Sequence, residues 1–287
     1  MTPDPSGVLL FYATLQAMQK YVVLNKQVGE TPLVCAEEWR AAHPEFEGLP
    51  LAYAGRLDPM ASGKLLILIG DECKRQSEYH GLDKTYEFEV LFGVQSDSGD
   101  VLGLVTECDV PRETDKATLQ NVATNFVGDV TFPYPKFSSK TIEGKPLHTW
   151  TLEGRLDEVD IPTYTSTVYR LQLLQTYTLS RAELYEQASA KIETIPPVTD
   201  ERKAIGNDFR RPEVRSTWKT FKSGTNEQNF TIARFSCTCS SGTYMRTLAE
   251  EIAKKIGTCG LAYSIHRTQI GKYKPLPLGF GVWLQKF

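Results

Sequence analysis

The sequence lacks the long apolar runs that mark membrane-spanning and exported proteins. No stretch approaches the roughly 20 apolar residues that a transmembrane helix needs. The most apolar early segment, residues 8–24, is interrupted by Gln16, Gln19 and Lys20 and has no basic leader, unlike a signal peptide. We therefore expect a protein that has no membrane partner and works in the cytoplasm.

Cysteine motifs are absent, although cysteine itself is not. The six cysteines include no Cys-x-x-Cys pair, which favours neither a zinc site nor a disulfide framework. Cys237 and Cys239 lie two residues apart and would face the same side of a strand. We expect all the thiols to be reduced. The sequence also contains no nucleotide-binding or redox-cofactor motif, so we expect no metal and no cofactor.

Neither sign of charge dominates. The chain has 32 Lys and Arg against 35 Asp and Glu, a net charge of -3. Basic residues are nevertheless concentrated in two stretches, 202–222 and 254–286. An RNA-binding protein needs Lys and Arg only on the face that meets the phosphates. The two stretches are therefore either such a face or ordinary solvated charge.

The hydrophobic pattern mixes short strands with helices. Residues 86–92 alternate apolar and charged side chains, which is typical of a half-buried strand. Ser180 precedes Glu183 by three residues, the spacing of a helix capping box, and Thr114 is a candidate N-cap for another helix. We predict an α+β fold on a largely antiparallel central sheet flanked by helices. The expected strands are 21–24, 65–70, 86–92, 168–174, 230–239 and 264–273, and the expected helices are 35–42, 115–126, 180–191 and 244–256.

One acid lies on an unusually constrained loop. Asp58 is followed directly by Pro59, which disfavours helical geometry at the preceding residue. Gly55 and Gly63 flank it and allow the backbone to turn or to approach another group closely. An apolar run follows at 65–69. Asp58 is therefore either a simple turn residue that bonds its own backbone or a carboxylate presented against the core.

The motif Gly55-x-Leu57-Asp58-Pro59-x-Ala61-x-Gly63 resembles the active-site motif of the TruB family of RNA pseudouridine synthases. Further stretches resemble the family's other motifs in the same order, from about Tyr21 to Tyr273. They are Asn25-Lys26-x-x-Gly29-x-Thr31, Lys84-Thr85-Tyr86 with Phe92-Gly93 and Ser96-Asp97-Ser98-x-Asp100, Gly242-Thr243-Tyr244-Met245-Arg246-Thr247, and Ile265-His266-Arg267.

The resemblance implies the pseudouridine synthase fold and an isomerase that converts uridine to pseudouridine without a cofactor. By default the substrate is the T-loop uridine in the T-arm of tRNA, and another structured RNA is the alternative. The implied roles are a reacting carboxylate at Asp58, a charge partner at Arg246 and a base-stacking ring at Tyr86, whose hydroxyl is also a candidate for proton transfer. Tyr244 and Ile265 would line the uracil pocket. Lys26 and Arg267 are expected to be structural or phosphate contacts.

Three local departures from the family pattern concern the RNA. Tyr53 stands where the family usually has a histidine that helps to open the RNA loop, and we expect it to stack there instead. The family's Pro-x-x-Ser-Ala-x-Lys segment is matched only loosely at 135–141, where Thr141 replaces the lysine, and His148 replaces a tyrosine. These departures leave the identity of the RNA more open than the reaction.

A further departure is an insertion at about 175–228 between two strands that the family joins by a short turn. A structureless loop of that length is improbable in a compact domain, so we predict a helix plus a basic, mobile arm. We expect residues 1–287 to form a single catalytic domain and monomer, without the C-terminal PUA domain of many relatives. The insertion would supply the RNA-docking surface, and deleting 196–222 would weaken RNA binding.

Two other functions remain open from the residues alone. A binding module that folds RNA without isomerising it needs no buried acid, so retention of Asp58, Tyr86, Tyr244 and Arg246 disfavours it. A carboxylate-based glycoside hydrolase needs a second positioned acid. Asp97 or Asp100 is a candidate, although both lie in a Ser- and Gly-rich turn where Asp is expected.

Overall fold

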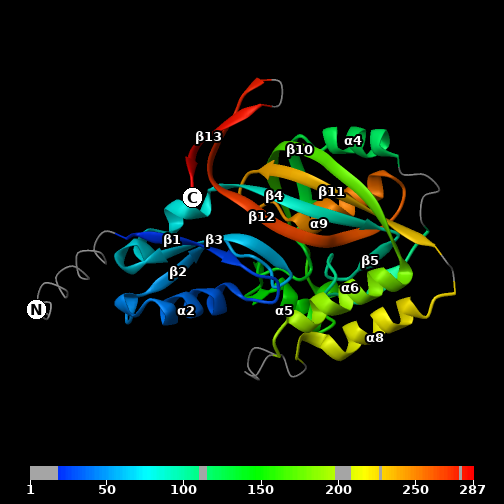
Figure 1. Ribbon diagram of the computed structural model, residues 1–287, viewed down its shortest axis with the longest axis horizontal. Coiled ribbons are helices and arrows are strands. Elements are labelled where there is room, and N and C mark those ends of the chain that lie inside the picture. Colours follow the sequence, from blue (N-terminus) through cyan, green and yellow to red (C-terminus); the bar gives the residue numbers. More distant parts are fainter. Residues whose placement is uncertain (1–18, 110–114, 198–207, 226–227, 278–279) are drawn as a thin grey trace, which may run out of the picture.

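The computed structural model describes residues 19–109, 115–197, 208–225, 228–277 and 280–287 (Figure 1). Within these ranges no helix is long and apolar enough to cross a membrane. The expected N-cap at Thr114 and the basic residues Arg202 and Lys203 lie outside the described residues, as does most of the apolar segment 8–24.

Nine strands of the described chain form one central sheet with the order β1-β3-β12-β4-β11-β10-β7, in which β2 also pairs with β3 and β13 with β12. β12 and β3 are parallel, and the other described pairs in this sheet are antiparallel. The predicted α+β fold on a largely antiparallel sheet is therefore confirmed. The strands are β1 (Tyr21–Lys26), β2 (Leu51–Ala54), β3 (Ala61–Ile69), β4 (Asp83–Phe92), β7 (Gly128–Pro133), β10 (Thr163–Ser180), β11 (Asn229–Cys239), β12 (Gly260–Pro275) and β13 (Gly281–Lys286).

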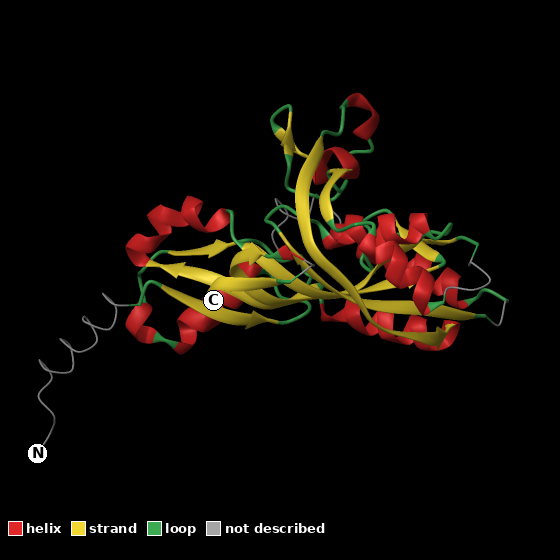
Figure 2. Ribbon diagram, turned by 90° about the horizontal axis from the view of Figure 1, so that it is seen from above, coloured by secondary structure: helices red, strands yellow, loops and turns green. Residues whose placement is uncertain are grey.

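Helices lie on both sides of the strands (Figure 2). Two short hairpins accompany them: β5 (Val94–Ser96) with β6 (Val105–Glu107), and β8 (Thr141–Ile142) with β9 (Lys145–Pro146). The helices are α2 (Pro32–Ala42), α3 (Gln76–His80), α4 (Lys116–Thr124), α5 (Leu147–Leu152), α6 (Arg181–Thr194), α8 (Arg211–Lys222) and α9 (Met245–Lys255). Asp115 rather than Thr114 caps α4, because its side chain accepts from the Thr118 amide. A short helix, α3, ends just before Gly81.

The core follows the predicted alternation along β4. Lys84, Tyr86, Phe88 and Val90 are buried, whereas the residues between them are only partly covered. Phe88 stacks on Phe235 of the neighbouring β11, with ring centroids 5.6 Å apart. This register places Tyr86 on the buried face of the sheet, at the end of the strand where Lys84 also lies.

The first half of the insertion has the predicted form. Ser180 caps α6 and forms the expected capping box with Glu183, each side chain meeting the other residue's backbone amide. Leu184, Ala188 and Ile192 repeat at helical spacing and are buried, so α6 packs its apolar face into the main core.

In the described part of the second half, residues 208–225, the chain is not the mobile arm that we predicted, and residues 198–207 lie outside the described residues. Residues 211–222 form α8, which lies against α6 (Figure 1) and buries Val214, Trp218 and Phe221 in the main core. Several of its basic side chains pair with acids on neighbouring elements, as Arg215 does with Glu193 and Lys222 with Glu186. Because deleting 196–222 would remove part of the core, it is not a clean test of RNA binding.

One cysteine prediction is wrong. Cys108 and Cys259 form a disulfide with Cα atoms 6.2 Å apart, which connects the segment after β6 to the turn before β12. Cys35, Cys73, Cys237 and Cys239 are free thiols, and the last two are buried in β11. A sequence separation of 151 residues gives no local sign of such a pair.

Candidate active site

Asp58 lies on the loop between β2 and β3, directly after the buried residue Leu57. The Ala61 amide donates to the Asp58 carbonyl over 3.0 Å and closes a tight turn. Gly55 and Gly63 bracket this turn and have φ values of +85° and +104°. A Cβ atom on Gly63 would lie 2.3 Å from the Arg267 carbonyl oxygen, so the position requires glycine for close approach as well as for conformation.

Two buried cations donate hydrogen bonds to backbone carbonyls at and next to the Asp58 loop. The Lys26 ammonium donates to the carbonyls of Ala61 over 2.5 Å and Gln27 over 2.9 Å. The Arg267 guanidinium donates to those of Lys64 over 2.7 Å and Gly55 over 3.1 Å. Both side chains are fully or almost fully buried. Of their two expected roles, this geometry corresponds to the structural one and leaves no exposed charge for a phosphate.

Arg246 approaches the Asp58 carboxylate from the side. It is the second residue of α9, and its side chain is buried except for 6% of its surface. Its Nε atom lies 2.9 Å from Oδ2 of Asp58. The N–H direction does not give a hydrogen bond to any acceptor among the described residues, so the contact is a close ion pair. Asp58 itself keeps 44% of its side-chain surface exposed.

Two backbone carbonyls fix the orientation of the Arg246 guanidinium. Nη1 donates to Ser98 over 2.8 Å and Nη2 donates to Phe137 over 3.1 Å. Burial alone lowers the pKa of Arg246, but the carboxylates of Asp58 and Asp100 outweigh it and hold this pKa above the ordinary value. The guanidinium therefore stays charged while each of its nitrogen atoms faces a different group.

A cavity of about 760 Å³ opens in front of Asp58 and contains all the predicted site residues. Tyr86 and Ile265, which are both largely buried, come from the adjacent strands β4 and β12. Tyr244 precedes α9 and packs edge-on against Tyr164, with ring centroids 5.2 Å apart. Tyr53, at the end of β2, is half-buried, and the Arg56 guanidinium lies 5.8 Å from its ring centroid.

Burial raises the pKa of the Tyr86 hydroxyl, although Arg267 acts in the opposite direction. The phenol is therefore neutral at physiological pH and presents an uncharged ring to the cavity. Burial also raises the pKa of Tyr244, with smaller contributions from Tyr134 and Asp58. Both rings are consequently apolar walls with a hydroxyl group at one end.

The two acids considered for a hydrolase are already engaged. Asp97 accepts from the Leu104 amide and pairs with Arg210 over 2.6 Å. Asp100 is 4% exposed, accepts from Ser98 Oγ and the Leu102 amide, and lies 3.8 Å from Nε of Arg246. Burial raises the pKa of Asp100, and Arg246 opposes that shift. Asp100 therefore acts mainly as a buried partner of Arg246.

Several cavity residues were not identified from the sequence. Lys84 lines the cavity and donates to Ser241 Oγ over 3.1 Å, and burial lowers its pKa to about 8. The insertion contributes Ile192, Ile195, Asp208, Arg210, Arg211 and Val214 to the wall. His148, a departure from the family pattern, also lines it and contacts the Ser138 carbonyl. Lys84 belongs to one of the motifs that resemble the family's and so had a sequence signal, whereas the insertion residues had only the basic composition of 202–222, which did not place them at this cavity.

Comparison with solved structures identifies the fold. A chain in the crystal structure of a Cbf5-Nop10-Gar1 complex superposes with a TM-score of 0.52 at 15% sequence identity, covering 90% of this chain and 50% of that chain. The likeness at this identity concerns the fold alone.

In the described ranges, no group of three or more His, Cys, Asp or Glu side chains is arranged to hold a metal ion.

Sequence comparison identifies the family. The family model described as "TruB family pseudouridylate synthase (N terminal domain)" matches residues 50–197, slightly more than half of the chain. The chain belongs to the TruB family, and the predicted pseudouridine synthase fold is confirmed with it.

Two curated relatives are both described as tRNA pseudouridine synthase B. The one from Hydrogenovibrio crunogenus is 28% identical over 257 residues, covering 89% of this chain and 66% of the relative. The one from Psychrobacter cryohalolentis is 30% identical over 256 residues, covering 88% of this chain and 56% of the relative. The chain thus spans between just over half and about two thirds of the length of these relatives.

Proposed function

We propose that this protein is an RNA pseudouridine synthase that isomerises a uridine in the T-loop of tRNA, using Asp58 and no cofactor. The observation that carries the proposal is the pairing of a partly exposed carboxylate, Asp58, with the buried guanidinium of Arg246 at the wall of a cavity of about 760 Å³. Membership of the TruB family and the description of the relatives as tRNA pseudouridine synthases support the choice of reaction and of RNA.

The reaction breaks the glycosidic bond between C1′ and N1, turns the uracil, and joins it again through C5. It needs a carboxylate that attacks the ribose or removes a proton from it, and in both routes the carboxylate must be ionised. The Arg246 guanidinium, 2.9 Å from Oδ2 of Asp58, is the charge partner that we assign to this carboxylate. The loop carbonyls held by Lys26 and Arg267 keep the backbone of Asp58 in one position during these steps.

The uracil must leave the RNA stack before it can reach Asp58. Tyr86 supplies a flat, neutral ring on which an extruded base can stack, an interaction worth roughly 1–3 kcal/mol per base. Ile265 and Tyr244 complete the apolar walls. Because burial raises the pKa of Tyr86, we assign it stacking first and proton transfer from C5 only as a second role.

Tyr53 and the exposed Arg56 lie at the same cavity, next to the Asp58 loop. We propose that the Tyr53 ring stacks against the RNA loop from which the uridine is extruded.

Strands from both ends of the described chain join one nine-stranded sheet, which supports a single catalytic domain in which the insertion forms part of the cavity wall. We further propose that the domain acts as a monomer in the cytoplasm.

The test is release of tritium from C5-labelled uridine in a tRNA transcript. The wild type should release it, and Asp58→Asn should reduce release by at least roughly a thousandfold while binding tRNA normally. Asp71→Asn is the matched control, since Asp71 is an exposed acid whose side chain is 94% accessible and pairs with Lys74 away from the cavity. A transcript with cytidine at the T-loop target tests the proposed position.

Three results would contradict the proposal in different ways. Tight tRNA binding by the wild type without tritium release would indicate an RNA-binding module. Tritium release that persists in Asp58→Asn would show that the reaction does not need the Asp58 carboxylate. Release from the cytidine-substituted transcript at the normal rate would retain the isomerase but reject the T-loop uridine as its substrate.

A further inference from the structure

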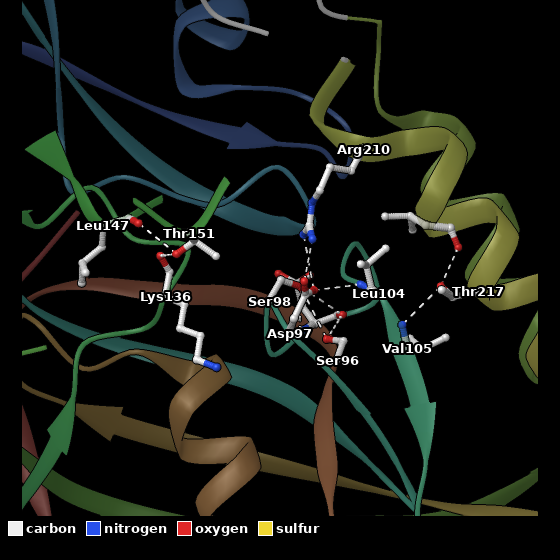
Figure 3. A network of polar contacts seen from close by, with 12 residues as sticks. Ser96, Asp97, Ser98, Leu104, Val105, Lys136, Leu147, Thr151, Arg210 and Thr217 are labelled. Carbon is white, nitrogen blue, oxygen red and sulfur yellow. Dashed lines mark hydrogen bonds and ion pairs between the residues drawn. The ribbon is translucent and has the colours of Figure 1, made fainter. Parts of the chain in front are cut away.

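Arg210 is one of three charged side chains that the insertion contributes to the wall of the cavity. Arg210 directly precedes α8 and has a left-handed backbone, with a φ of +60°. Its guanidinium pairs with both oxygens of Asp97, at 2.6 Å and 3.3 Å (Figure 3). The same guanidinium carbon lies 4.6 Å from the centroid of the Phe137 ring. One side chain therefore contacts two segments that are far apart in the sequence.

These two segments are the ones that orient Arg246. The carbonyl of Ser98, the residue after Asp97, accepts from Nη1 of Arg246. The carbonyl of Phe137 accepts from Nη2. Arg210 thus contacts both of the segments whose backbone carbonyls face the Arg246 guanidinium, one through Asp97 and the other through the Phe137 ring.

The position of Arg210 is itself well determined by α8. The Trp218 indole donates to the Val101 carbonyl over 3.0 Å, and Thr217 Oγ1 accepts from the Val105 amide over 3.2 Å. Both contacts attach the helix to the segment that follows Asp97 and Ser98, as the Thr217 contact in Figure 3 illustrates. Because Trp218 is fully buried, the helix cannot shift without disturbing the core.

We infer that Arg210 is a positioning residue for the proposed reaction: it holds the Ser98 and Phe137 carbonyls so that Arg246 faces Asp58. The inference rests on the proposed function, because it assigns Arg210 to the orientation of that reacting pair. It gives the insertion a role in turnover rather than in docking RNA. A phosphate contact is the competing role, since Arg210 lines the cavity and 22% of its side chain is exposed.

The experiment compares Arg210→Gln with Arg215→Gln. Arg215 is the matched control, because it lies on α8, which Arg210 directly precedes, and forms a close pair with Glu193, with contacts of 2.7 Å and 2.6 Å, but does not line the cavity. Single-turnover tritium release gives the rate at saturating tRNA. A filter-binding titration over a range of salt concentrations gives Kd and its salt dependence.

Arg210→Gln should lower the saturated rate about tenfold, since displacements of well under 1 Å at a reacting pair have effects of this size. The Kd for tRNA should change by less than about twofold and keep its salt dependence. Arg210→Lys should recover part of the rate, because an ammonium can pair with Asp97 but cannot form the two-point contact. Arg215→Gln should behave as the wild type in both measurements.

Asp97→Asn provides a second route to the same contact. It should lower the saturated rate by a similar factor, and the double variant with Arg210→Gln should be no slower than the single ones, because both remove one interaction. If Arg210→Gln fails to fold, Arg210→Lys and Asp97→Asn decide the question. Losses of saturated rate that add when these two substitutions are combined would count against the inference.

Several outcomes would overturn the role of Arg210. An unchanged saturated rate would do so, as would a weaker Kd with a reduced salt dependence and a normal rate, which is the signature of a phosphate contact. An equal loss in Arg215→Gln would indicate general damage to α8. A wild type without tritium release would reject the proposed function itself, and a normal wild-type rate keeps the two failures distinguishable.

Discussion

Replacing Arg246 by lysine tests whether charge alone is sufficient at the site. The guanidinium directs Nε at Asp58, Nη1 at Ser98 and Nη2 at Phe137. A lysine ammonium keeps the positive charge but concentrates its donors on one nitrogen atom, which cannot occupy three separated positions. We therefore expect Arg246→Lys to fold, to bind tRNA and to react slowly.

The size of both effects follows from these contacts. A hydrogen bond from a charged donor contributes about 1.5–3 kcal/mol, so losing one of the two carbonyl contacts should lower the free energy of unfolding by about 2 kcal/mol. If the charge pair with Asp58 lengthens from 2.9 Å to about 5 Å, it weakens by about 2 kcal/mol at an effective dielectric constant of about 20. If the transition state loses that stabilisation, the reaction rate falls roughly 30-fold. Because 44% of the Asp58 side chain is exposed, water screens the pair and this factor is an upper bound.

The assay is single-turnover tritium release at saturating tRNA, together with urea unfolding to measure the folded fraction. Arg234→Lys is the matched control, because Arg234 pairs with Glu87 on the sheet and lies outside the cavity. A wild-type rate per folded Arg246→Lys molecule would refute the argument from geometry. So would a rate loss that the unfolded fraction accounts for completely.

Two further predictions concern stability. Burial lowers the pKa of Lys84 from 10.5 to about 8, so between those values the unfolded chain binds more protons than the native chain and stability rises with pH. The free energy of unfolding in urea of the wild type minus that of Lys84→Met should therefore increase by about 2 kcal/mol from pH 8 to about 10, and a constant difference would contradict the lowered pKa of Lys84. Closing a loop of 151 residues should make the oxidised wild type more stable than Cys108→Ser by up to about 5 kcal/mol; dithiothreitol should abolish the difference, and a gap that dithiothreitol leaves unchanged would exclude the disulfide as its cause.

Local patterns were sufficient for six of the nine described strands of the central sheet and for the loop that carries Asp58, whereas β2, β7 and β13 were not predicted. Period-two alternation predicted β4, and the glycine and proline spacing predicted a constrained turn before β3. These features depend on neighbouring residues, which the sequence displays directly. The capping box at Ser180 is local in the same sense, and α6 begins where it predicted.

The α8 helix had a signal in the spacing of its apolar residues, but the basic composition of the stretch outweighed that signal in our prediction. Val214, Trp218 and Phe221 are spaced by four and three residues, as on one face of a helix, and Pro212 is near its start. The many basic residues of the stretch favoured a solvated arm. The acids that neutralise them, such as Glu193 and Glu186, lie on α6, and pairing across two helices cannot be inferred before their packing is known.

Contacts between distant segments were beyond the sequence altogether. The Cys108–Cys259 disulfide and the Arg210–Asp97 pair each join residues more than 100 positions apart. Motif matching identified Asp58 and Arg246 as partners, but it gave no information about what holds the guanidinium in place. That depends on the Ser98 and Phe137 carbonyls, whose side chains are irrelevant to the contact.

The site depends on three buried cations that are satisfied in different ways. Lys26 and Arg267 donate to carbonyls of the Asp58 loop, so they fix the backbone on both sides of the acid without neutralising it. Arg246 is balanced by two carboxylates, of which Asp100 is buried and Asp58 faces the cavity. Because Asp100 already compensates part of that charge, Asp58 can change its protonation or bonding without leaving Arg246 as an uncompensated charge in the interior. The buried carboxylate of Asp100 therefore allows Asp58 to react while the charge of Arg246 stays partly balanced.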